Sequence, residues 1–183
     1  RDKEESIFFR KEEFNADLNL EAKKVVNKFE QEKISFTVIT KLADFKLKRS
    51  LPIYTLSSNP EEVAYEIRSS LHPGANLTSR EFLKATINKA AEFNILIFEF
   101  VEAYNKKQKA NIEGFYLTPN VIVLKRNQKS YKREIFTLIH ELGHYLLNVE
   151  EIDAASDESI KNKEIQNTTE RWCNDFAYYF LIG

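Results

Sequence analysis

The chain of 183 residues is poor in several residue types: it has no methionine, one cysteine, one tryptophan and three histidines. The single cysteine, Cys173, excludes an internal disulfide framework and fits a reducing compartment. No apolar run approaches the length that crosses a membrane, and no signal-peptide pattern opens the chain. A formal net charge of −1 excludes the overall basic footprint of a nucleic-acid-binding domain.

The missing methionine also bears on the extent of the protein. Because translation starts with methionine and this chain starts with Arg1, we expect the sequence to be a piece of a longer protein, which an N-terminal domain could precede. The residues present are 43% hydrophobic, which is enough for one good core with an appended helical element.

The hydrophobic pattern predicts helices on either side of a short run of strands. Helical patterns cover residues 19–46, although residues 34–39 have strand-like composition, and residues 79–91; Asn59-Pro60 signals another helix start. Strand patterns cover residues 95–100, 114–118 and 121–124, the last two joined as a β-hairpin. This order predicts an α+β fold with a small antiparallel sheet.

The most informative segment reads H-E-x-x-H, with His140, Glu141 and His144 inside an otherwise apolar helical stretch. On a helix, positions i and i+4 share a face, so the two imidazoles can converge on one metal ion. Glu141 lies about 100° further round and can reach a water on that metal. The alternative is two surface histidines beside a glutamate on a partly buried helix.

A catalytic zinc site needs a third protein ligand and leaves a fourth position to water. The remaining histidine, His72, lies in a turn-like segment and is interpreted as a loop residue. The third ligand should therefore be a carboxylate that follows the motif. The candidates are Glu150, Glu151, Asp153, Asp157, Glu158, Glu164, Glu170 and Asp175.

Glu170 differs from the other carboxylates because it opens an apolar helical pattern and borders the side expected to be buried, one turn before Asn174. The spacing of Asn167 and Glu170 also fits a capping box, in which the carboxylate would only stabilise the start of a helix. Spacing alone leaves both interpretations of Glu170 open.

Two stretches resemble a known family. Residues 136–144, F-T-L-I-H-E-L-G-H, and residues 170–182, with E-x-x-C-N-x-F-A-x-x-F-L-I, are similar to the motifs of the ImmA/IrrE family of metallopeptidases. Looser matches extend the resemblance over about residues 60–183. Cys173 stands where the family usually has alanine, and Gly183 stands where its motif has proline. Neither departure removes a candidate ligand.

The resemblance implies a zincin-like metallopeptidase domain over residues 56–183, after an N-terminal helical or linker segment over residues 1–55. It implies that His140, His144 and Glu170 bind one zinc ion and that Glu141 is the general base. Thr137 and Asn174 are candidates for orienting a ligand, with simple packing as the alternative for each. The candidates for an oxyanion donor are Tyr116, Tyr131 and Tyr145.

Proteins with these motifs are cytoplasmic proteases that cleave a helix-turn-helix repressor and so relieve transcriptional repression. The resemblance therefore implies a zinc endopeptidase with a protein substrate, no membrane partner, and nucleic acid only through a missing or partner helix-turn-helix domain. The alternative is a sensor domain of a DNA-binding transcription factor that keeps the zincin fold. A purely structural zinc site is disfavoured because it needs no base at Glu141 and closes with a fourth protein ligand.

Overall fold

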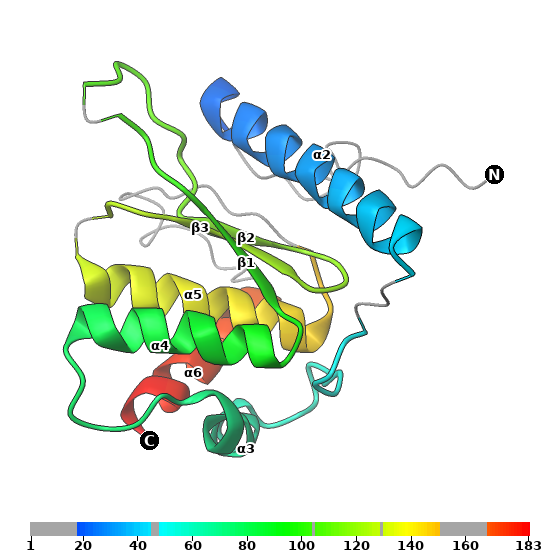
Figure 1. Ribbon diagram of the computed structural model, residues 1–183. Helices are drawn as coiled ribbons and strands as arrows, with labels where there is room; N and C mark the ends of the chain where they lie inside the picture. Colours follow the sequence, from blue (N-terminus) through cyan, green and yellow to red (C-terminus); the bar gives the residue numbers. More distant parts are fainter. Residues whose placement is uncertain (1–17, 45–47, 104, 129, 151–167) are drawn as a thin grey trace.

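The computed structural model describes residues 18–44, 48–103, 105–128, 130–150 and 168–183 (Figure 1). The elements in these residues follow the predicted order of helices, strands and helices, so the predicted α+β class is confirmed. They are α2 (Leu20–Leu42), α3 (Pro60–Leu71), α4 (Ser79–Glu92), β1 (Leu96–Phe100), β2 (Gly114–Leu117), β3 (Val121–Lys125), α5 (Tyr131–Leu147) and α6 (Thr168–Ile182).

The sheet is mixed, so the prediction of an antiparallel sheet was wrong for one of its two strand pairs. The strand order is β1-β3-β2, with β2 antiparallel to β3 and β1 parallel to β3. The tight turn after Leu117 forces the β2–β3 hairpin to be antiparallel, as predicted. The long connection after β1 leads to β2, which lies at the other edge of the sheet from β1. Strand β3 lies between them and pairs in parallel with β1, with Leu96 opposite Val121.

The sheet separates two apolar layers, because alternate residues of a strand point to opposite faces. On one face, Phe115 and Val123 join a cluster with Val26 and Phe29 of α2. On the other face, Tyr116 joins the main core with the four helices α3 to α6. Figure 1 shows α2 above the sheet and α4 and α5 below it.

Helix α2 is a single helix, and the strand-like composition of residues 34–39 does not interrupt it. Its first half is capped and packed. The Asn19 side chain accepts a hydrogen bond from the N–H of Ala22, and the Phe29 ring lies 6.0 Å from the Phe98 ring, centroid to centroid. Local β propensity is a weak preference that a capped and packed helix overrides.

The predicted helix starts are confirmed at α3 and α4. Asn59 is the N-cap of α3 with Pro60 in its first turn, and Thr78 forms a capping box with Glu81 at the start of α4. His72 is the C-cap residue of α3, which agrees with its interpretation as a loop residue.

The C-terminal end of α5 is held by the segment that precedes α3. The guanidinium of Arg49 donates a hydrogen bond of 2.6 Å to the carbonyl of Tyr145 and lies 3.7 Å from the centroid of its ring. The N–H of Tyr54 donates to the carbonyl of Leu146. These contacts satisfy carbonyl groups that a helix end leaves without intrahelical partners.

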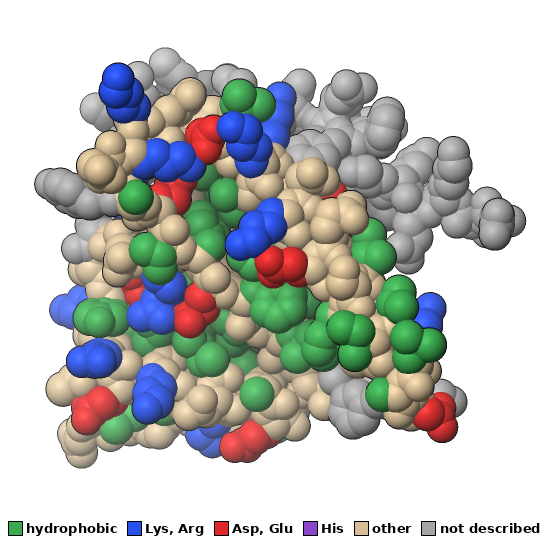
Figure 2. Space-filling view, turned by 45° about the horizontal axis from the view of Figure 1, so that its top comes forward, with side chains coloured by type: hydrophobic (Ala, Val, Ile, Leu, Met, Phe, Trp, Pro, Cys, Tyr) green, Lys and Arg blue, Asp and Glu red, His purple; other side chains and the backbone are tan. Residues whose placement is uncertain are grey.

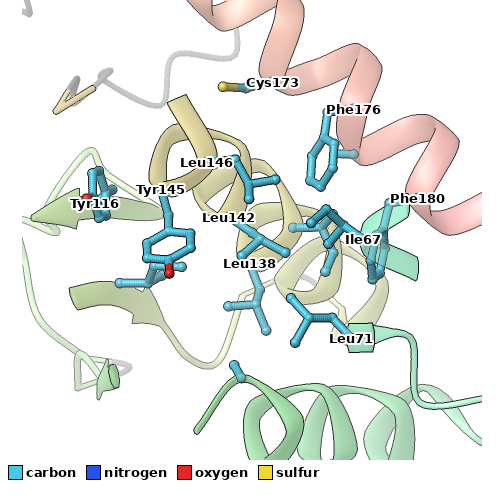
Figure 3. Close-up of a cluster of buried hydrophobic side chains, with 14 of the residues drawn as sticks. Ile67, Leu71, Tyr116, Leu138, Leu142, Tyr145, Leu146, Cys173, Phe176 and Phe180 are labelled. Carbon is cyan, nitrogen blue, oxygen red and sulfur yellow. The ribbon is translucent and has the colours of Figure 1, made fainter. Parts of the chain in front are cut away.

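Helices α5 and α6 approach closely at a glycine. A Cβ atom on Gly143 would lie 3.0 Å from the Sγ atom and 3.1 Å from the Cβ atom of Cys173. Around this contact, Phe176 and Phe180 of α6 point toward Ile67 of α3 and Leu142 of α5 (Figure 3). The absence of a side chain at Gly143 therefore sets the distance between the two helices.

The surface seen in Figure 2 has lysine and arginine side chains interspersed with acidic and apolar ones, without a continuous basic stripe on that face. Among the residues that the structure describes, no helix combines the length and the apolar character needed to cross a bilayer.

Replacement of Gly143 by alanine should lower the free energy of unfolding by about 1–3 kcal/mol, because the new methyl group overpacks the contact with Cys173. A loss of stability is informative because helix propensity alone would favour alanine over glycine by about 1 kcal/mol. Denaturant unfolding measures the change. The control is Ser69→Ala on the exposed face of α3, which should stay within about 0.5 kcal/mol of the parent. An increase in stability for Gly143→Ala would contradict the close approach of α5 and α6.

Candidate metal centre

Three side chains from two helices converge at one point. His140 and His144 lie one turn apart on α5, and their Nε2 atoms are 3.2 Å apart. Glu170, in the first turn of α6, brings its Oε2 atom to 3.1 Å from His140 Nε2 and its Oε1 atom to 2.9 Å from His144 Nε2. Their ligand atoms all lie within 4.8 Å of one another, an arrangement that could hold a metal ion.

The spacing of these atoms fits a small tetrahedral ion. Ligand atoms bound to zinc at about 2.0–2.2 Å lie roughly 3.3–3.6 Å from each other at the corners of a tetrahedron. The observed separations of 2.9–3.2 Å between the two Nε2 atoms and the Glu170 oxygens are slightly shorter. Two imidazoles and one carboxylate are also the donor set of a catalytic zinc site. The residues present therefore fit zinc with little rearrangement.

The three side chains differ in exposure. The side chain of His144 is 1% exposed, whereas those of His140 and Glu170 are 13% and 19% exposed. His140 and Glu170 are therefore the members of the group that reach solvent.

Asn174, one of the two ligand-orienting candidates, contacts His140. Its Oδ1 atom lies 3.0 Å from Nδ1 of His140. Because an amide oxygen only accepts hydrogen bonds, this contact places a proton of His140 on Nδ1.

The pKa values of His144 and Glu170 are shifted in opposite directions. Burial alone would lower the pKa of His144, but Cys173, Glu170 and Glu141 raise it well above the usual value. Burial alone would raise the pKa of Glu170, but hydrogen bonds from His140 and His144 hold it well below its usual range. Burial raises the pKa of the Cys173 thiol to about 11.

Glu141 lies next to the two histidines on the adjacent face of α5 and is 6% exposed. Its position depends on Gly114 at the start of β2. A Cβ atom on Gly114 would lie 3.1 Å from Cγ of Glu141 and 2.8 Å from Cγ2 of Thr137. The bare backbone of Gly114 therefore leaves room for the carboxylate beside the centre.

Comparison with known families decides the identity. Residues 90–183, which include all of these side chains, match the family model of the IrrE N-terminal-like domain, peptidase family M78. The chain belongs to this family. No curated protein and no solved structure matches the chain. Membership supports a metallopeptidase-type function for this M78 domain, which is a hydrolase class.

Thr137, the second ligand-orienting candidate, makes a different contact in the M78 domain. Its hydroxyl lies 3.4 Å from Oε1 of Gln128, and Gln128 Nε2 donates to the carbonyl of Lys125 at 2.9 Å. Thr137 thus ties α5 to the end of β3. It affects the centre through its methyl group, which packs beside Gly114.

The other candidates from the sequence lie apart from the three converging side chains. Tyr116 donates to the carbonyl of Pro119, Tyr145 is fully buried in the core, and Tyr131 is the first residue of α5. Glu150 accepts hydrogen bonds from Thr118. The remaining carboxylate candidates before residue 168, namely Glu151, Asp153, Asp157, Glu158 and Glu164, lie outside the described residues, as does Asn167 of the alternative capping box.

One supporting pair was missed by sequence reasoning. Glu134 is 3% exposed, accepts a hydrogen bond of 2.9 Å from Nε of Arg126 and another from the N–H of Gln128. This pair holds the loop between β3 and α5 and so the start of α5. The sequence contains a signal for this pair: Glu134 lies in an apolar helical pattern, and a buried carboxylate needs a partner.

The metal-free protein should have a characteristic dependence of stability on pH. The raised pKa of His144 adds stability that is complete below about pH 6.5 and is lost as the pH rises through the folded value. The lowered pKa of Glu170 adds stability that is complete above about pH 4.5 and is lost as the pH falls through the folded value. Both contributions are present together between these two pH values.

We therefore expect the difference in unfolding free energy between the metal-free parent and Glu170→Gln to be largest between about pH 4.5 and 6.5. Denaturant unfolding of chelator-treated protein across this range measures it. The matched control is Asp175→Asn, also on α6, whose carboxylate is half exposed and 3.9 Å from Arg171. A difference that grows steadily toward pH 9 would contradict the assignment.

Proposed function

We propose that the chain is a zinc-dependent endopeptidase in which His140, His144 and Glu170 bind one zinc ion and Glu141 is the general base. The observation that carries this proposal is the convergence of the two imidazoles and the Glu170 carboxylate, with Glu141 on the adjacent helix face. Membership in peptidase family M78 supports the hydrolytic part of the proposal.

The reaction is the addition of water across a peptide bond. Zinc, when bound, would supply the Lewis acid that activates water and polarises the scissile carbonyl. Glu141 accepts a proton as the water oxygen attacks the carbonyl carbon, and afterwards donates a proton to the nitrogen of the leaving amine. A peptide would reach the centre from the side of His140 and Glu170, which are its partly exposed members.

Two further residues prepare this chemistry. Asn174 holds His140 in the tautomer whose Nε2 atom faces the centre. The bare backbone of Gly114 packs against Cγ of Glu141, a contact that a Cβ atom at this position would disturb.

The substrate that we propose is a helix-turn-helix transcriptional repressor in the cytoplasm, whose cleavage would relieve repression. The support for this substrate is the resemblance to the ImmA/IrrE family over residues 60–183. A strand of such a substrate could add to the sheet near Gly114, next to Glu141.

We also propose that residues 56–183 are the peptidase domain and that residues 1–55 are an N-terminal helical or linker segment, of which α2 packs against the sheet. Within that segment, Val26 and Phe29 of α2 pack against Phe115 and Val123 of the sheet. The same sheet carries Gly114, so α2 stabilises the framework on which Glu141 rests.

Zinc binding tests the ligand set. The wild-type protein should bind one zinc ion, and His144→Ala or Glu170→Ala should weaken binding by more than about 100-fold. Asn174→Ala should cost about 10–100-fold, as expected for a group that orients a ligand. Titration with a competing chelator measures the affinities, with Asp175→Asn as the control on the same helix. Wild-type affinity in Glu170→Ala would remove Glu170 from the ligand set.

Cleavage of a co-encoded helix-turn-helix repressor tests the role of Glu141. Glu141→Gln should keep its zinc and lose about 10²–10⁴-fold in rate, because the amide cannot accept the proton. Rates are compared at equal zinc content by gel or mass spectrometry. Equal cleavage by both proteins would exclude Glu141 as the base. The absence of cleavage by zinc-loaded wild type would favour a sensor domain that keeps the fold.

A further inference from the structure

Helices α5 and α6 run antiparallel at the centre, and this places a pair of aromatic side chains beside it. His144 meets Glu170, and one turn along the helices His140 meets Asn174. One further turn, about 6 Å along each helix, leads from His140 to Phe136 on α5 and from Asn174 to Tyr178 on α6, so both residues continue the row of side chains that meet at the centre.

Both rings are exposed. Phe136 is 38% exposed and Tyr178 is 55% exposed. The Phe136 ring also contacts the His140 ring, with centroids 6.3 Å apart and planes inclined by 30°. Single exposed apolar residues are common on proteins. Two aromatic rings on facing helices, directly beside a candidate reaction centre, form a local surface with a definite position.

Two charged pairs lie on the same helices. On α5, Nη2 of Arg133 lies 3.7 Å from a carboxylate oxygen of Glu113, and on α6, Nε of Arg171 lies 3.9 Å from Asp175. What Phe136 and Tyr178 share is an exposed aromatic ring, which suits an apolar or aromatic side chain.

We propose that Phe136 and Tyr178 form a subsite that binds an apolar or aromatic side chain of the substrate peptide next to the scissile bond. This inference rests on the proposed peptidase function. It predicts that the enzyme prefers a large apolar residue at that position, since burial of such a side chain against two rings removes apolar surface from water.

Two probes that differ in one side chain test the subsite without a turnover measurement. N-acetyl-phenylalanine hydroxamate and N-acetyl-alanine hydroxamate share the group that chelates zinc and differ only in a phenyl ring. With the zinc-loaded full chain, calorimetry should show the phenylalanine probe binding at least about tenfold more tightly. Phe136→Ala and Tyr178→Ala should each reduce this ratio, and the double variant should bring it near one, with unchanged zinc content and unchanged affinity for the alanine probe.

The matched control is Tyr131→Ala, because Tyr131 is 41% exposed on the same helix but lies more than one turn further from His140. It should keep the wild-type ratio. Equal binding of the two probes by the zinc-loaded wild type, or an unchanged ratio in the double variant, would overturn the subsite alone. A protein that takes up no zinc, and so neither probe, would overturn the proposed function and the subsite with it.

Discussion

The structure depends on the close contact between α5 and α6. Gly143 has no side chain, so Cys173 can lie directly against it, and this brings the first turn of α6 to the motif helix. Glu170 then reaches both imidazoles at 2.9–3.1 Å. The same approach puts Asn174 on His140. The close approach at Gly143 thus brings together the three converging side chains and also Asn174, which contacts His140. Because protein interiors are close-packed, a single added methyl group would disturb this approach.

The rest of the fold supports this contact from several sides. Arg49 and Tyr54 bind the carbonyls at the C-terminal end of α5, and Glu134 with Arg126 fixes its start. Without a metal ion, a buried carboxylate and a buried imidazole stabilise each other, which raises the pKa of His144 and lowers that of Glu170. The arrangement is compatible with a divalent cation, which would replace a proton as the partner of the same side chains.

Much of this could be predicted from the sequence, and the gaps have physical causes. The i, i+4 spacing of His140 and His144 predicts their convergence, because helix geometry alone determines it. The position of Glu170 was open, since a carboxylate in a first helical turn fits a cap as well as a ligand; the resemblance, not the spacing, indicated the ligand. The parallel pairing of β1 with β3 was missed because strand order across a long connection depends on tertiary packing. The role of Gly114 could not be predicted, because a close approach shows only when the partner strand and helix are in place.

The most direct test of the account is a crystal structure of the zinc-loaded protein with the anomalous signal of the metal. The account predicts one zinc peak about 2.0–2.2 Å from Nε2 of His140, Nε2 of His144 and a carboxylate oxygen of Glu170, with the fourth position open to solvent. A peak held by the two histidines with Glu170 turned away, or a site closed by a fourth protein ligand, would contradict it.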